Sequence, residues 1–150
     1  MIHGMDTGFL VSAELVEHPD HVTARATLSR LLGGGDRVAL APQVLAEFIH
    51  VVTDSRRFRQ AVEMSEAQGI ARKWWTAREV DHVFPNAEAT RQFLDWLDRL
   101  QLGRKRLLDT LLAATYRQGG IRSLPTTNPN DFGVFDCFAL ITPSGAIGKS

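Results

Sequence analysis

Short apolar segments alternate along this chain with longer segments whose apolar residues recur at helical spacing. Helical spacing runs through residues 12–15, 21–32, 42–52, 65–75, 85–103 and 107–118. The strand candidates are residues 2–6, 37–40, 80–84, 121–126 and 138–141. Strands that alternate with helices form βαβ units, whose strands lie parallel in one sheet. The alternation therefore predicts an α/β domain with a mainly parallel central sheet.

Local signals indicate where some of these helices begin and what they bury. Pro42 suits a first helical turn, Ser65 and Gln68 resemble a capping box, and Asn86 stands where the fifth helix begins. In that fifth helix, the residues expected to face inward are Phe93, Leu94, Leu97 and Leu100.

Composition and charge limit the class of protein. The 150 residues suit one domain, residues 1–150, and the 44% hydrophobic and 23% charged fractions are ordinary globular values. Basic and acidic residues, 17 of each, cancel, which lowers the case for a broad basic surface but leaves a local basic patch open. Cys137 is the one cysteine, so we expect a reducing, cytoplasmic setting. The sequence lacks a signal-peptide pattern and an apolar run of about 20 residues, so we expect no membrane association.

Four acidic residues occupy positions from which a parallel sheet could bring them together. Asp6 closes the first strand candidate, Glu47 lies in the third helical segment, Asp109 stands in the first turn of the last one, and Asp131 lies in the loop after the fourth strand candidate. Ligands of such sheets bind beyond the carboxyl ends of the strands. Carboxylates gathered there repel one another unless a hard divalent cation such as Mg²⁺ lies between them. The pattern therefore predicts a metal-dependent site.

Each of these residues, taken alone, also has an ordinary structural interpretation. Asp109 can complement the helix dipole, Asp131 can belong to a turn, and Glu47 can be a solvated helix residue. However, Glu47 lies roughly 40° beyond the edge of its helix's apolar stripe, where the wall of a cleft would be. Asp6 is the hardest to explain without a partner, because a charge at the end of a buried strand costs free energy. The joint occurrence of the four favours the site.

Short motifs carry these acidic residues in a fixed order. They are Met5-Asp6-Thr7, PQVLAEF at 42–48, LDTLLAA at 108–114 and TNPNDF at 127–132. The ordered set resembles the PIN-domain ribonucleases of the VapC toxin type over essentially the whole chain. The resemblance implies a three-layer α/β/α sandwich around a parallel sheet. It also implies Mg²⁺- or Mn²⁺-dependent cleavage of single-stranded or loop RNA, a cognate antitoxin protein and a homodimer.

The resemblance also assigns roles to individual residues. The metal ligands would be Asp6, Glu47 and Asp109. Thr7 would hold the first carboxylate in place, and Glu47 or Asp109 would act as the base. The fourth acidic position falls within residues 128–131, where Asn128 stands in place of the family's usual aspartate and Asp131 follows three residues later. A neutral amide binds a cation weakly, so we expect one well-held metal and a weaker or absent second one.

Basic side chains must offset the acidic site if RNA is to approach it. The candidates that follow or precede the site segments are Arg56, Arg57, Arg104 and Arg106. Phe58 is a candidate for stacking on a base. Trp74 and Trp75 recur at helical spacing with Ile70 and Ala71, which favours packing in the core or against a partner over base stacking.

Two other functions remain open from the sequence. A non-catalytic PIN-like binding module with a decayed site would explain Asn128, although retention of the other acidic residues argues against it. A phosphotransfer α/β domain would use an aspartate after a strand, as Asp6 is. Such domains usually need a lysine after a later strand, and no clear candidate stands near residues 121–127.

Overall fold

A parallel sheet runs through the computed structural model, which describes residues 1–143 and 147–149. Its strands are β1 (Ile2–Gly4), β2 (Arg37–Leu40), β3 (Val80–His82), β4 (Ser123–Pro125), β5 (Ala139–Ile141) and β6 (Ile147–Lys149). They lie in the order β3-β2-β1-β4-β5-β6; neighbours from β3 to β5 are parallel, and β6 is antiparallel to β5. The expected α/β architecture with a mainly parallel sheet is confirmed, whereas the apolar pattern did not predict β6.

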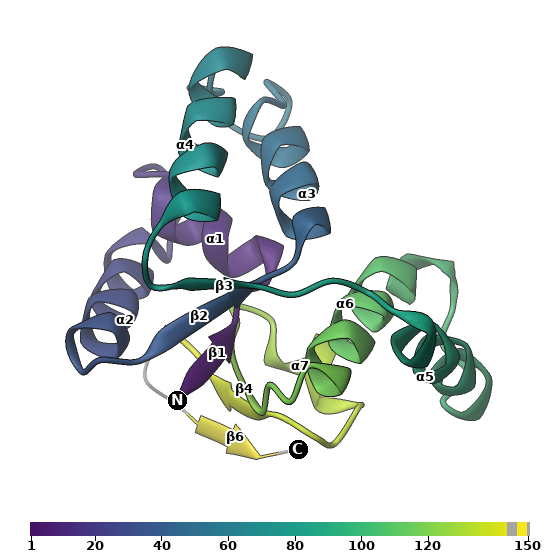
Figure 1. Ribbon diagram of the computed structural model, residues 1–150. Coiled ribbons are helices and arrows are strands. Elements are labelled where there is room, and N and C mark those ends of the chain that lie inside the picture. The colour runs from purple at the N-terminus through teal and green to yellow at the C-terminus, as the bar shows by residue number, and fades with distance from the viewer. Residues whose placement is uncertain (144–146, 150) are drawn as a thin grey trace.

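Helices cover both faces of this sheet. They are α1 (Thr7–Glu14), α2 (His21–Gly33), α3 (Pro42–Val52), α4 (Met64–Thr76), α5 (Ala87–Arg99), α6 (Leu107–Gln118) and α7 (Pro129–Gly133), with a 3-10 turn, η1 (Arg104–Arg106), before α6. Figure 1 shows α1 and α2 on one side of the sheet and α5, α6 and α7 on the other, while α3 and α4 stand together above β3. The three-layer α/β/α arrangement is thus confirmed. Among the described residues, none of the helices is both long and apolar enough to cross a bilayer.

Some local expectations are wrong, each for a definable reason. The first helix begins at Thr7 because Asp6 caps it, accepting a hydrogen bond from the Phe9 amide, so it is longer than the segment 12–15. Helix α4 begins one residue before Ser65, with Glu63 as N-cap and no capping hydrogen bond from a side chain, so Ser65 and Gln68 form no capping box.

Helix α5 also differs from its expectation. It begins beside Asn86, as expected, and the Asn86 side chain caps it by accepting a hydrogen bond from the Ala89 amide at 2.8 Å. The helix ends at Arg99, short of the expected residue 103, and it buries Ala89 and Trp96, whereas Leu94 is 57% exposed. The large indole sets which face turns inward because it contacts the Phe135 ring, with centroids 4.6 Å apart.

The strand β1 lies deep in the sheet although it contains a polar residue. His3 is 2% exposed, and its two ring nitrogens contact the Ser123 hydroxyl at 2.7 Å and the Asp36 carboxylate at 2.8 Å. At Gly4 the ring of Tyr116 lies so close that an added Cβ would come within 2.7 Å of its Cδ2. The Tyr116 hydroxyl donates a hydrogen bond to the Met5 carbonyl. These contacts fix the end of β1, from which the chain enters the candidate site.

Candidate active site

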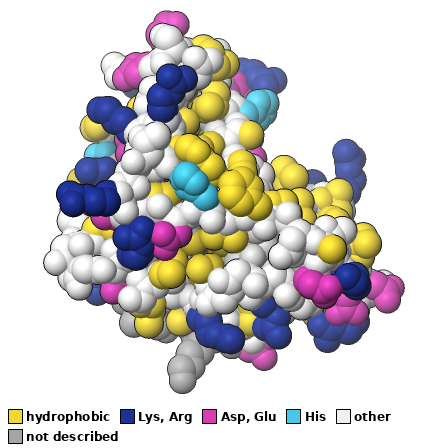
Figure 2. Space-filling view, viewed as in Figure 1, with side chains coloured by type: hydrophobic (Ala, Val, Ile, Leu, Met, Phe, Trp, Pro, Cys, Tyr) yellow, Lys and Arg dark blue, Asp and Glu magenta, His cyan; other side chains and the backbone are white. Residues whose placement is uncertain are grey.

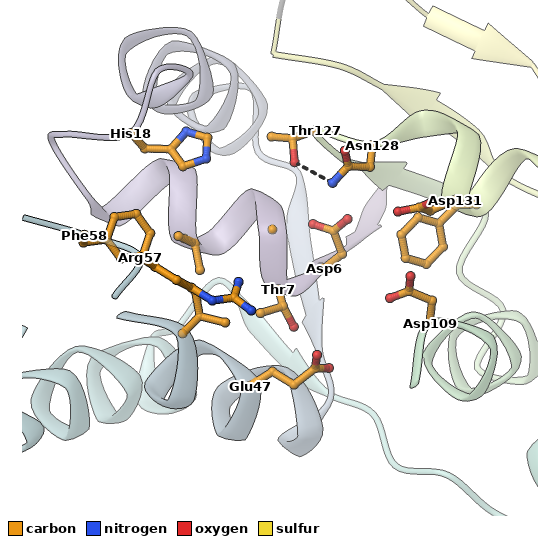
Figure 3. A pocket seen from close by; sticks show the side chains of 14 residues that line it. Asp6, Thr7, His18, Glu47, Arg57, Phe58, Asp109, Thr127, Asn128 and Asp131 are labelled. Atoms are coloured by element: carbon orange, nitrogen blue, oxygen red, sulfur yellow. Dashed lines mark hydrogen bonds between the residues drawn. The ribbon is translucent and has the colours of Figure 1, made fainter. Parts of the chain in front are cut away.

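A cavity of about 320 Å³ opens where β1 and β4 end. The strand order runs from β1 through β2 on one side and from β4 through β5 on the other. The adjacent strands β1 and β4 therefore form the topological switch point, which is where α/β sheets bind ligands. Side chains from widely separated segments line it: Asp6, Thr7, Gly8, Val11, His18, Glu47, Val51, Arg57, Phe58, Asp109, Thr127, Asn128, Asp131 and Phe132. Figure 3 shows Asp6, Glu47, Asp109 and Asp131 gathered toward one end. The structure therefore brings the four acidic candidates together.

Asp6 is the most buried of the four carboxylates, at 5% exposure. One carboxylate oxygen accepts a hydrogen bond from the Phe9 amide at 2.6 Å, and the other accepts one from the Thr126 hydroxyl at 2.6 Å. Burial raises the pKa of Asp6 to about 7, the two hydrogen bonds oppose the rise, and the nearby Asp109 and Asp131 add to it. The two hydrogen bonds thus hold the Asp6 carboxylate in one orientation. None of the groups that shift its pKa is a positively charged side chain that would offset its charge.

The hydroxyl that holds Asp6 belongs to Thr126 and not, as expected, to Thr7. Thr126 is fully buried just after β4 and also accepts a hydrogen bond from the Asn128 amide at 3.0 Å. Thr7 begins α1, so its side chain turns toward α3, where it faces Glu47 without a well-directed hydrogen bond. The sequence shows that Thr126 directly follows a strand candidate, but it does not show that this strand lies beside β1, and that strand order is what brings Thr126 to Asp6.

Glu47 projects from α3 into the cavity wall, as its position beyond the apolar stripe predicted. The buried residues of α3 are Val44, Phe48 and Val52, and Val51 lines the cavity beside Glu47. Partial burial raises the pKa of Glu47, and Asp109 raises it further, while the Thr7 hydroxyl and His50 oppose the rise.

Asp109 and Asp131 face each other from α6 and α7. Partial burial raises the pKa of Asp109, Asp131 raises it further, and the Arg106 guanidinium lowers it. Arg106 also donates a hydrogen bond to the main-chain carbonyl of Asp131, which ties α7 to the start of α6. Asp131 lies in the first turn of α7, where the sequence predicted a loop. Asn128 is the exposed N-cap of α7 and contacts the Thr127 hydroxyl with its amide nitrogen at 3.4 Å. Of the two candidates for the fourth position, Asp131 is the one coupled to the other carboxylates.

The basic candidates are distributed unevenly around the cavity. Arg57 lines it, and Arg106 lies behind Asp131. Arg56 is exposed and pairs with the Asp54 carboxylate at 3.1 Å, and Arg104 is exposed in η1 and is not among the lining residues.

Aromatic side chains also line the cavity, two of them from loops on its far side and the third, Phe132, from α7. Phe58, the candidate for stacking on a base, lines the cavity, and so does His18, which the sequence analysis did not single out. Trp74 and Trp75 pack within the protein: the Trp74 indole donates to Glu14 at 3.0 Å, and the Trp75 ring stacks on His82 with centroids 3.5 Å apart.

The donor set suits a hard divalent cation. Carboxylate oxygens are the ligands that Mg²⁺ and Mn²⁺ prefer, and burial with mutual repulsion raises the pKa of Asp6, Glu47 and Asp109. Within the described part of the chain, no three acidic, histidine or cysteine side chains already form a close metal-binding group. A cation would therefore have to draw these carboxylates nearer to one another.

Comparisons with known proteins identify the family. A family model described as "PIN domain" matches residues 5–135. The chain is 28% identical over 144 residues to Ribonuclease VapC24 of Mycobacterium tuberculosis, covering 94% of this chain and 98% of that protein.

Solved structures share the fold. A crystal structure of Mycobacterium tuberculosis VapC20, described as a sarcin-ricin loop cleaving toxin, superposes with a TM-score of 0.63 at 22% identity, over 83% of this chain and 87% of that one. A toxin-antitoxin complex from Klebsiella pneumoniae superposes with a TM-score of 0.61 at 14% identity, over 94% and 97%. Since the match to the family model takes in all four acidic residues that line the cavity, the chain belongs to the PIN domain family.

Proposed function

We propose that this PIN-domain chain is an endoribonuclease that hydrolyses RNA phosphodiester bonds with Mg²⁺ or Mn²⁺, and that it is the toxin of a toxin-antitoxin pair. The observation that carries the proposal is the convergence of four carboxylates, from four separate segments, on one cavity at the switch point of the sheet. Its likeness to Ribonuclease VapC24 supports RNA as the substrate class. The proposed enzyme is one PIN-like domain over residues 1–150, and we expect it to act on RNA in the cytoplasm.

The proposed metal ligands are Asp6, Glu47 and Asp109. A divalent cation bound there supplies positive charge to a phosphate oxygen and lowers the pKa of a water molecule. The hydrogen bonds from Phe9 and Thr126 hold the Asp6 carboxylate in position before any ligand arrives.

The acid–base chemistry would fall to Glu47 or Asp109, in addition to a role in metal binding. Partial burial raises the pKa of both carboxylates, which makes each a stronger acceptor for a proton from the attacking water. Asp131 completes the acidic set opposite Asp109 and influences its charge.

The proposed partners are RNA, a cognate antitoxin and a second copy of the chain. The complex from Klebsiella pneumoniae, whose toxin-antitoxin assembly contains the same fold, supports the antitoxin. For the homodimer, Figure 2 shows hydrophobic side chains running between α3 and α4 toward the end of β3. Leu45, Ile49 and Trp75 line a groove there, and the neighbouring Phe84 is 57% exposed. An apolar surface of this kind is typical of interfaces between subunits.

The test compares RNA cleavage by the wild type, Asp6→Asn and a matched control, Asp98→Asn, which changes an exposed aspartate on α5. We expect the wild type and the control to cleave single-stranded RNA in Mn²⁺ or Mg²⁺ but not in EDTA, and Asp6→Asn to be inactive. Sequencing of RNA 5′ ends after brief expression of each form then identifies the cleaved RNA. Cleavage that survives EDTA or Asp6→Asn contradicts the proposal.

The rival is a non-catalytic PIN-like module, which Asn128 favours because it places an amide where the family usually has a carboxylate. RNA binding without metal-dependent cleavage by the wild type would support that rival.

A further inference from the structure

The cavity extends well beyond its acidic end. Figure 3 shows His18 and Phe58 at the opposite end, with Arg57 between these rings and Thr7. Because Mg²⁺–oxygen bonds are about 2.1 Å long, a cation and its ligands would occupy only the space among the carboxylates. The rest of the cavity is therefore open to a part of the substrate next to the reacting phosphate.

Two loops that build this end are tied together. His18 lies between α1 and α2, whereas Arg57 and Phe58 lie between α3 and α4. The Glu17 carboxylate crosses from the first loop to the second and accepts hydrogen bonds from the Arg59 amide at 3.2 Å and the Gln60 amide at 3.1 Å. The two walls are thus held at a set separation without a ligand, which lowers the cost of ordering them on binding.

The three side chains offer three different kinds of contact. The Asp20 amide donates to Nδ1 of His18 at 3.0 Å, so the neutral imidazole carries its hydrogen on Nε2, where it can donate to a ligand. Phe58 is partly buried against the core and still lines the cavity with its ring. Arg57 is 59% exposed and is held near the Asp54 carboxylate at 3.6 Å. A hydrogen-bond donor can contact the edge of a base, an aromatic ring can stack on its face, and a cation can contact its phosphate, so the three side chains together suit a nucleotide.

Resting on the function proposed above, we infer that His18, Phe58 and Arg57 form a nucleotide subsite beside the scissile phosphate of a single-stranded RNA. One base stacks on Phe58, and the His18 Nε2–H donates to an acceptor on the edge of that base. Arg57 contacts the adjoining phosphate. The carboxylate end of the cavity cleaves the RNA, and the end lined by His18, Phe58 and Arg57 positions the strand.

The test measures binding in EDTA, where no cleavage is expected. The probes are a fluorescent oligouridylate of roughly ten nucleotides and an abasic ribose-phosphate chain of the same length. The two probes carry equal charge. The dissociation constant of the abasic chain divided by that of the oligouridylate therefore isolates contacts to bases. We expect Phe58→Leu to lower this ratio by about 5- to 100-fold, as the loss of one stacked base predicts. His18→Ala should lower it less, and Phe58→Tyr, which keeps the ring, should preserve it.

The matched control is Phe93→Leu, which changes a phenylalanine that is partly buried against the core, as Phe58 is, but lies outside the cavity, and it should leave the ratio unchanged. Arg57→Gln should lower the affinity for both probes by the same factor, and it should reduce the salt dependence of binding by about one counterion. Mn²⁺ titration by calorimetry should give wild-type affinity for all of these variants, which shows that the acidic end is intact.

An unchanged ratio in Phe58→Leu, or an equal drop in Phe93→Leu, overturns the subsite. Failure of the wild type to cleave RNA in Mn²⁺ would instead count against the proposed function, and the binding ratio in EDTA would still decide the subsite.

Discussion

Replacing Asp6 by asparagine should stabilise the metal-free protein above neutral pH, even though it removes a proposed catalytic group. Asp6 is 5% exposed and its pKa is raised to about 7, chiefly by burial. Above that pH the folded protein must hold a buried negative charge close to Asp109 and Asp131. Asparagine carries no charge, and its carbonyl can still accept the hydrogen bond from the Phe9 amide.

The sign and size follow from proton linkage. Between the ordinary pKa of 3.8 and about 7, the folded state binds a proton at Asp6 that the unfolded chain has released, so the free energy of unfolding falls as pH rises. At about 1.4 kcal/mol for each pH unit over this interval, the wild type loses about 4 kcal/mol that Asp6→Asn does not lose. The weaker hydrogen bond to Thr126 costs the variant about 1–3 kcal/mol at every pH, so it shifts the curve without changing its slope.

The assay is urea unfolding in EDTA from pH 4 to pH 8.5, for the wild type, Asp6→Asn and the control Asp98→Asn. The pKa values of Asp36, Asp54 and Asp81 are lowered by hydrogen bonds from their partners, but these residues are present in every form and cancel in the differences. Added Mn²⁺ should stabilise the wild type above pH 7 and leave Asp6→Asn unchanged, because only a native site that binds the ion gains from it. A difference between wild type and Asp6→Asn that stays constant across this pH range would refute the reasoning.

Three further changes test the supports of the site. Gly4→Ala should lower the free energy of unfolding by about 1–3 kcal/mol, because the new Cβ would lie 2.7 Å from the Tyr116 ring; a neutral effect in urea unfolding would show that the ring can move away. Thr126→Val should raise the pKa of Asp6 further by removing a hydrogen bond that lowers it, which NMR titration of the carboxyl carbon measures; an unchanged pKa counts against this contact. Arg106→Gln should weaken RNA binding several-fold and reduce its salt dependence by about one counterion, without weakening Mn²⁺ binding; wild-type RNA affinity would remove Arg106 from the interface.

The local sequence determined much of the fold because its signals act over a few residues. The strand β2 and the helix α6 have the bounds that apolar spacing predicted, and α3 begins at the proline that suits a first turn. Glu47 lines the cavity because the angle between it and the apolar stripe is a property of the helix alone. Local pattern failed where a large side chain chose the buried face, as Trp96 did in α5.

Only the tertiary structure decided which groups meet within the site. Thr126 lies 120 residues from Asp6, and their hydrogen bond depends on β4 lying beside β1. Asp131 lies close enough to Asp6 and Asp109 to raise their pKa values because the short helix α7 places it there and Arg106 contacts its main chain. His18 and Phe58 face one cavity because Glu17 joins their loops. Spacing along the chain sets the direction of a side chain within its own element, whereas contacts between elements depend on the strand order and packing that the whole chain adopts.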